Sequence, residues 1–269
     1  MAEHYVLGTR SEELDRLGLQ HQIWQSCTSA LWEQAHFGPG QTLLDAGCGP
    51  GFSTADLAAL VGTQGRVVAV DGALEFAQAT RLRCEALGYA QVEARHADLN
   101  DAPFDDAQFD GIFLRWVVSF LAEPAPLVQR LATSLKPGGR LLAMDYGNYR
   151  AAKLFPECPV LVELFDYFER ANRTGGGDFD HGVRLAQWAL DAGLRVTHFE
   201  PIVHAARPGD RYWSWFTGFC RVFVPSLVAS GQMPAAFAGQ VVDELNRLEQ
   251  TPGAFFMTPP VMAMIAIKD

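Results

Sequence analysis

A glycine-rich turn in the first fifth of the chain has the residue types and spacing of a nucleotide-type ligand site. In the segment 41–53, QTLLDAGCGPGFS, Asp45 closes a short apolar run, and Gly47, Gly49 and Gly51 follow. Alternate glycines remove the Cβ atoms that would keep a ligand away from the backbone. The N–H groups at the start of a following helix point towards whatever lies there. The pattern therefore predicts a ligand site at a strand-to-helix turn.

A carboxylate follows at the distance expected for the same site. Residues 66–70, RVVAV, are typical of a second buried strand, and Asp71 ends it twenty positions after Gly51. A βαβ unit needs that distance to return to the same edge of a sheet. There Asp71 can accept hydrogen bonds from both hydroxyls of a ribose. Capping of a helix over 73–87 is the alternative role, but the preceding glycine turn favours ligand binding.

The glycine spacing separates two classes of cofactor. The dinucleotide pattern G-x-G-x-x-G requires its third glycine where this chain has Phe52, and it has no acidic residue two positions before its first glycine. An NAD-type oxidoreductase is therefore only the second candidate.

The segment Asp45-Ala46-Gly47-Cys48-Gly49-Pro50-Gly51 resembles the first motif of class I S-adenosylmethionine (SAM) methyltransferases. Four further features follow in the order of that family: Asp71, the pair Asp98-Leu99, a strand introduced by Phe109-Asp110, and the turn Lys136 to Gly139. The resemblance covers about residues 40–146 and implies SAM as cofactor and S-adenosylhomocysteine as product. The cofactor-binding residues that it implies are Tyr5, Asp45, Gly47, Cys48, Gly49, Asp71, Gly72, Asp98, Leu99 and Arg115.

The elements that must position these residues alternate between strands and helices. The strands are expected near 43–45, 66–70, 91–95, 111–116, 140–144, 195–203 and 261–268, and the helices over 11–36, 54–61, 73–87, 124–135 and 183–192. Right-handed crossovers place such helices on both faces of a mostly parallel sheet. The resemblance implies an α/β fold with a doubly wound sheet of seven strands, the last of them antiparallel.

Three segments are expected to form a helical cap over this core. We expect one domain over 1–269, with its core at about 37–146 and 183–269 and its cap from 1–36, 147–182 and 206–259. The last insertion is rich in large aromatic residues, which favours an apolar or aromatic small-molecule substrate, although at least half of them must simply pack the insertion against the sheet. The expected substrate-binding residues are Trp24, Trp116, Tyr146, Trp213 and Phe216.

Methyl transfer to an oxygen benefits from a nearby base, and His is the usual one. The candidates are His4, His21, His181, His204, Asp145 and Tyr146. Tyr146 and His21 come first, because both fall on elements that should face the ligand crevice. O-methylation is expected ahead of N- or C-methylation, and no metal site is expected.

Composition limits the partners. The chain has 269 residues and a formal net charge of −10, without a basic run, which argues against nucleic-acid binding. Five scattered cysteines and the lack of a signal peptide or an apolar run of about 18 residues favour a cytoplasmic protein away from the membrane, as a monomer or homodimer. Two other functions stay open: a SAM-site protein that catalyses a non-methylating reaction, and a non-catalytic binding protein.

Overall fold

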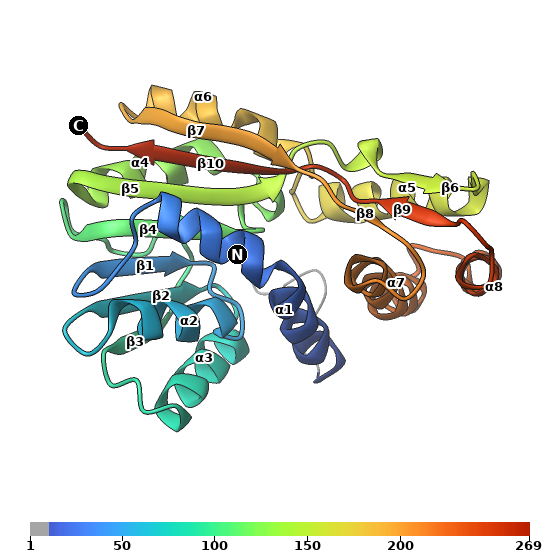
Figure 1. Cartoon of the computed structure of the whole chain (residues 1–269), viewed down its shortest axis with the longest axis horizontal. Coiled ribbons are helices and arrows are strands. Elements are labelled where there is room, and N and C mark those ends of the chain that lie inside the picture. Colours follow the sequence, from blue (N-terminus) through green and yellow to red (C-terminus); the bar gives the residue numbers. More distant parts are fainter. Residues whose placement is uncertain (1–10) are drawn as a thin grey trace.

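The central element of the computed structural model, which describes residues 11–269, is a sheet of seven strands (Figure 1). Every neighbouring pair is parallel except those of β10, which is antiparallel to both of its neighbours. The predicted sheet with an antiparallel last strand is confirmed. In spatial order the strands are β3 (Val92–His96), β2 (Arg66–Asp71), β1 (Thr42–Ala46), β4 (Phe109–Arg115), β5 (Leu135–Tyr146), β10 (Val261–Ile267) and β7 (Arg195–Ile202).

The strand order reverses between β1 and β4. From β1 the chain first adds β2 and β3 on one side, then crosses to β4 and β5 on the other. Ala46 at the end of β1 pairs with Val70 of β2 and with Leu114 of β4. The carboxyl ends of these three strands therefore lie at the same edge of the sheet. Ligands of open α/β sheets bind at such a reversal.

Helices cover both faces of the sheet, because the strand side chains alternate between two apolar layers. Leu43 belongs to one layer and its neighbour Leu44 to the other. On the first face lie α1 (Ser11–Gln34), α2 (Phe52–Val61) and α3 (Leu74–Ala86), and on the second lie α4 (Pro124–Ser134) and α6 (Leu185–Asp191).

The remaining elements extend past the carboxyl ends of the parallel strands (Figure 1). They include α5 (Pro159–Thr174), α7 (Arg211–Ala229), α8 (Ala235–Glu249) and a sheet of β6 (Lys153–Phe155), β9 (Phe255–Met257) and β8 (Ala205–Ala206). The sequence did not predict this sheet, because strands of two or three residues are too short to show a period. Three short 3₁₀ turns connect the elements at Val118–Phe120, Tyr149–Ala151 and His181–Arg184.

The predicted turn at 136–139 lies inside a strand, so its boundary was wrong. β5 already begins at Leu135, and its register with β4 shifts between Phe109 and Gly111. Lys136 forms an ion pair with Asp110 at 2.9 Å. Lys136 therefore helps to fix the start of β5 against β4.

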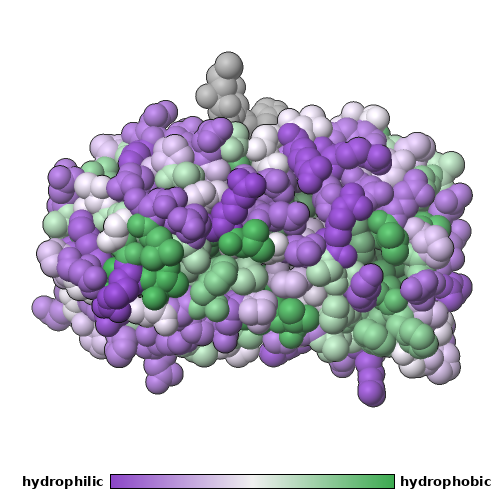
Figure 2. All heavy atoms as spheres, turned by 90° about the horizontal axis from the view of Figure 1, so that it is seen from above, coloured by the Kyte–Doolittle hydropathy of each residue, from purple (hydrophilic) through white to green (hydrophobic). Residues whose placement is uncertain are grey.

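The surface along the β7 side is mainly hydrophilic, and its hydrophobic groups form separate patches (Figure 2). Most large aromatic side chains of the cap are internal; for example, Trp213 and Phe223 are buried. Within residues 11–269, no helix has the length and apolar character needed to cross a membrane.

Candidate functional site

The glycine turn between β1 and α2 has the tight backbone that the sequence predicts. The φ angles of Gly47, Gly49 and Gly51 are +76°, +55° and +82°, a region that residues with a Cβ seldom adopt. The N–H of Gly47 donates to the carbonyl of Val70 at 2.8 Å, which ties the turn to the end of β2. The glycines are therefore required by the backbone itself.

Two glycines of this region face open space. A Cβ on Gly49 or on Gly72 would meet no atom within 4 Å, whereas a Cβ on Gly47 would lie 2.4 Å from Cγ2 of Val117. Gly47 is thus needed for packing, while Gly49 and Gly72 border a cradle that a ligand can fill.

Asp71 stands between these two open glycines. Its Oδ2 accepts a hydrogen bond from the N–H of Gly49 and its Oδ1 accepts one from the N–H of Ala73, both at 2.8 Å. Burial raises the pKa of Asp71, and the two backbone hydrogen bonds oppose that effect. Each carboxylate oxygen retains a free lone pair, so Asp71 can hold the turn and still accept from two ligand hydroxyls.

Asp45 lies beneath the turn and is buried. Its Oδ2 accepts a hydrogen bond from the Thr54 hydroxyl at 2.6 Å, which ties the end of β1 to the first turn of α2. Burial raises the pKa of Asp45 to about 6, against the effects of Thr54 and the positive charge of Arg115. Asp45 therefore contributes negative charge near the turn without lying on its surface.

Asp98 is brought to the same edge of the sheet by strand pairing. Asp71 pairs with His96 at the end of β3, and the N–H of Ala97 donates to the carbonyl of Asp71 at 3.0 Å. One residue further on, Oδ1 of Asp98 accepts from the N–H of Asn100 at 2.9 Å. Strand pairing thus brings the backbone of Asp98 to the sheet edge where Asp71 lies, and Leu99 beside Asp98 is buried.

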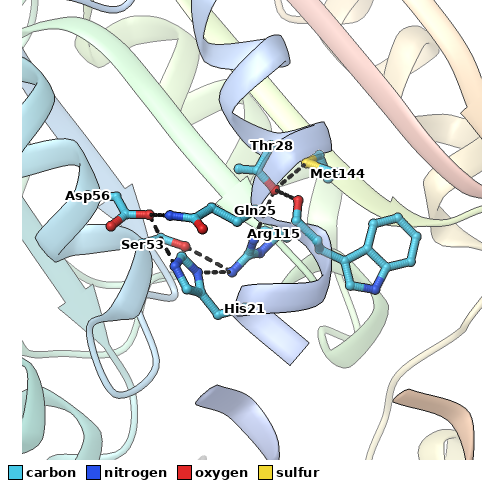
Figure 3. A network of polar contacts seen from close by, with 8 residues as sticks. His21, Gln25, Thr28, Ser53, Asp56, Arg115 and Met144 are labelled. Atoms are coloured by element: carbon cyan, nitrogen blue, oxygen red, sulfur yellow. Dashed lines mark hydrogen bonds and ion pairs between the residues drawn. The ribbon is translucent and has the colours of Figure 1, made fainter. Parts of the chain in front are cut away.

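Arg115 ends β4 and lies in a network of polar contacts with residues of α1 and α2 (Figure 3). Its guanidinium donates to the hydroxyls of Thr28 and Ser53 at 3.0 and 2.9 Å and to Nδ1 of His21 at 3.2 Å. Burial lowers the pKa of Arg115 to about 10, while the nearby Asp45 and Asp56 charges act to raise it. Arg115 therefore remains charged at neutral pH, in contact with neutral side chains.

His21 belongs to this polar network and does not line the aromatic cavity described below. Its Nε2 lies 3.1 Å from Oδ2 of Asp56, and its ring stacks on Phe52 with the centroids 5.6 Å apart. Both ring nitrogens are thus engaged with Asp56 and Arg115 (Figure 3).

A cavity lies between α1, α5, α7 and the end of β5. Trp116, which follows Arg115, forms part of its wall, and the Arg115 guanidinium lies 5.0 Å from the centre of the Trp116 ring. The wall is mainly aromatic and consists of Arg16, Gln20, Trp116, Phe120, Tyr146, Tyr149, Asn172, Phe179, Phe219 and Phe223.

Tyr146 lies on the cavity wall at the end of β5, as the sequence predicts. Burial raises its pKa, against the effect of the positive charge of Arg16. The phenol therefore stays protonated at neutral pH and is suited to hydrogen bonding rather than to accepting a proton as a base.

The other candidate bases in the described part of the chain have structural contacts. Asp145 is buried and accepts hydrogen bonds from the N–H groups of Val117 and Tyr146 at 2.8 and 2.9 Å. Nδ1 of His181 lies 2.9 Å from the carbonyl oxygen of Val118. His204 stacks on Tyr212. His4 and Tyr5 lie outside the described residues.

Three of the predicted substrate residues do not line the cavity that Trp116 and Tyr146 line. Trp24 is fully buried and packs edge-on against Trp116 and Tyr212, and Trp213 is buried in the same apolar layer. Phe216 lines a second, smaller cavity that shares Tyr146 with the first. The structure therefore places Trp24 and Trp213 in the packing between α1 and α7 and away from both cavities.

Sequence reasoning missed several residues of the cavity wall. Arg16 and Gln20 are one helical turn apart on α1, and the guanidinium of Arg16 donates to Oε1 of Gln20 at 2.9 Å. Two polar residues with that spacing beside an apolar helix face were a usable signal. Tyr149 and Phe179 lie in connecting segments, where no period reveals which side chain points inwards.

Comparison with known proteins relates the core to methyltransferases, as the sequence motifs predict. Residues 44–143 match the family described as a methyltransferase domain. A demethylmenaquinone methyltransferase of Symbiobacterium thermophilum is 31% identical over 150 residues, which cover 54% of this chain and 60% of that protein. An uncharacterised 37.1 kDa protein of a transposon from Streptomyces fradiae is 27% identical over 251 residues, which cover 90% of this chain and 67% of that protein.

A solved structure extends the likeness of the fold to the whole chain. The geranyl diphosphate C-methyltransferase of Streptomyces coelicolor aligns with a TM-score of 0.60 and 17% identity, over 100% of this chain and 90% of that one. The present chain spans 60% of the length of the Symbiobacterium protein and 67% of the length of the Streptomyces fradiae protein.

Proposed function

The chain belongs to the class I SAM-dependent methyltransferases, and we propose that it transfers the methyl group of SAM to a hydroxyl of a small, largely apolar aromatic molecule. The observation that carries this proposal is the cavity lined mainly by aromatic side chains, which reaches Arg115 through the neighbouring Trp116. A lining of that kind suits a ring-containing small molecule.

Unpaired polar atoms of the wall residues support an acceptor that carries a hydroxyl. Nε1 of Trp116 is a buried donor and Oδ1 of Asn172 a buried acceptor, and neither has a hydrogen-bond partner among the described residues. Leaving such groups unpaired is costly. A hydroxyl both donates and accepts, so it can satisfy groups of both kinds after small side-chain movements.

The residues around the glycine turn suit the three parts of SAM. We assign Asp71 to the ribose hydroxyls, Asp98 and Leu99 to the adenine, and Arg115 to the carboxylate of the methionine part. The open space beside Gly49 and Gly72 leaves room for the ligand between these groups. Cys48 contributes its backbone position within the turn.

When bound, SAM supplies an activated methyl group on a sulfonium. The protein's contribution is to orient the acceptor and exclude water, which can account for much of the rate of such a displacement. Of the described residues that line the cavity, none is His, Asp or Glu. This composition favours an acceptor hydroxyl acidic enough to ionise without a dedicated base, with the protonated Tyr146 donating a hydrogen bond to its oxygen.

The test is a SAM-dependent assay of hydroxylated aromatic molecules, in which S-adenosylhomocysteine and the methylated product are both measured. Phe223→Trp fills the cavity and should raise the KM for the acceptor without changing SAM affinity. Phe237→Trp is the matched control, because Phe237 packs against Tyr167 in the cap and does not line the cavity. Product carrying its new methyl on nitrogen or carbon would refute O-methylation.

The same assay separates the alternative function. Retained SAM binding, together with a converted substrate and no S-adenosylhomocysteine, would indicate a non-methylating reaction. Equal effects of the two Trp variants on the KM would show that the acceptor does not occupy this cavity.

A further inference from the structure

We propose that His21 is a positioning residue for the cofactor carboxylate, because it holds the Arg115 guanidinium in place as a neutral hydrogen-bond acceptor delivered by helix α1. The inference rests on the proposed placement of that carboxylate at Arg115. It makes the docking of α1 part of cofactor binding.

The contacts of His21 fix its tautomer. A guanidinium has only donors, so Nδ1 of His21, 3.2 Å from an Arg115 nitrogen, must be the unprotonated acceptor. Nε2 lies 3.1 Å from Oδ2 of Asp56 and therefore carries the proton that it donates to the carboxylate. The imidazole is thus neutral, with one nitrogen committed to each neighbour.

Asp56 is suited to hold the imidazole in this orientation. Its Oδ2 also accepts from the amide of Gln25 at 2.9 Å, one turn along α1 from His21 (Figure 3). Burial acts to raise the pKa of Asp56, but the hydrogen bonds from His21 and Gln25, together with nearby positive charge such as that of Arg115, lower it. Asp56 of α2 is therefore an ionised acceptor that binds two side chains of α1.

The Arg115 guanidinium has no anionic partner among the described residues, and an anionic ligand could supply one. Among the described residues, no carboxylate lies within ion-pair distance of its guanidinium, and its hydrogen-bond partners Thr28, Ser53 and His21 are all neutral. Charged groups that are removed from water are normally paired. Ser53 is two residues from Gly51, so the guanidinium lies beside the glycine turn, where the cofactor's amino-acid part would lie.

Of the three neutral partners, His21 is the one fixed by a second charged residue. Thr28 can donate its hydroxyl proton to the carbonyl of Trp24 at 3.0 Å or to Sδ of Met144 at 3.8 Å, and neither partner is charged. The chain Asp56–His21–Arg115 instead connects α2, α1 and β4. Loss of the acceptor at Nδ1 should let the guanidinium turn away from the cofactor carboxylate without opening the adenine and ribose part of the site.

Two substitutions separate the roles of the two ring nitrogens. In His21→Asn the amide oxygen can occupy the place of Nδ1 and accept from Arg115. In His21→Gln the longer amide reaches towards Asp56 and leaves Arg115 without its acceptor. Both variants remove the ring that stacks on Phe52, so each is the control for the other.

The experiment is calorimetric binding of two ligands that differ in the amino-acid part. S-adenosylhomocysteine carries the carboxylate, and 5′-methylthioadenosine lacks the whole amino-acid end. We expect His21→Gln to weaken binding of S-adenosylhomocysteine about tenfold and to leave binding of methylthioadenosine unchanged. His21→Asn should stay within about twofold of wild type for both ligands.

Arg115→Gln distinguishes failure of this inference from failure of its premise. If that variant binds S-adenosylhomocysteine like wild type, the carboxylate is not at Arg115 and the inference falls with its premise. If Arg115→Gln selectively weakens S-adenosylhomocysteine but His21→Gln does not, the positioning role alone is refuted. Equal losses for both ligands in both His21 variants would show a merely structural role and also refute it. Failure of the wild-type protein to bind S-adenosylhomocysteine would instead overturn the proposed function.

Discussion

Alanine substitutions at Gly47 and Gly49 should separate the stability of the glycine turn from its ligand binding. Both residues have positive φ, so an alanine at either position costs about 1 kcal/mol of backbone strain, partly offset by the reduced freedom of the unfolded chain. Only at Gly47 does the new Cβ also meet a side chain, 2.4 Å from Cγ2 of Val117. Such overpacking adds about 1–3 kcal/mol.

The expected losses of unfolding free energy are therefore about 2–4 kcal/mol for Gly47→Ala and about 1 kcal/mol or less for Gly49→Ala. Urea denaturation of the ligand-free proteins measures both. Adding Val117→Ala to Gly47→Ala should cost less than the sum of the two single changes, by about 1 kcal/mol or more, because the clash is removed.

Binding should discriminate the variants in another way. The alanine methyl at position 49 points into the open cradle, so Gly49→Ala should lose at least about tenfold in affinity for S-adenosylhomocysteine although it folds almost normally. Wild-type affinity of Gly49→Ala, measured by calorimetry, would refute the placement of the ligand at this turn. Equal destabilisation by the two alanines would refute the role given to Val117.

Three further predictions concern the carboxylates. Asp71→Ala should weaken S-adenosylhomocysteine binding by about 1–3 kcal/mol in calorimetry through loss of charge-assisted hydrogen bonds; unchanged affinity would remove Asp71 from the site. The folded-state pKa of Asp45, about 6, lies above its unfolded value, so proton uptake stabilises the fold as pH falls. Relative to Asp45→Asn, the ligand-free wild type should therefore gain about 2 kcal/mol of unfolding free energy between pH 7 and pH 4.5, and a constant difference in urea denaturation would contradict this. Asp145→Asn should lose about 2–3 kcal/mol of unfolding free energy, because Asp145 accepts from the hydroxyl and N–H of Ser119 and from two other backbone N–H groups; a loss no larger than that of Ser119→Ala would contradict this role.

The sheet and the glycine turn were predictable because their signals are local. Buried strands appear as short apolar runs, and a turn that needs positive φ requires glycine within the same few residues. Asp71 and Asp98 could be assigned to one edge because parallel strands joined by helices return to that edge. The main elements accordingly lie within a few residues of their predicted ranges.

Only the tertiary structure determined which partners the remaining site residues contact. His21 and Arg115 meet across 94 positions of sequence, and the cavity wall combines side chains of α1, α5, α7 and connecting segments. Sequence periodicity gives the face of a helix but not its neighbour, so His21 and Trp24 were both expected to face the ligand. Packing instead directs Trp24 into the core and His21 towards Arg115 and Asp56. The sequence alone determined the cofactor class, because its motif is contiguous, whereas the three-dimensional packing of the cap determined the shape and lining of the aromatic cavity.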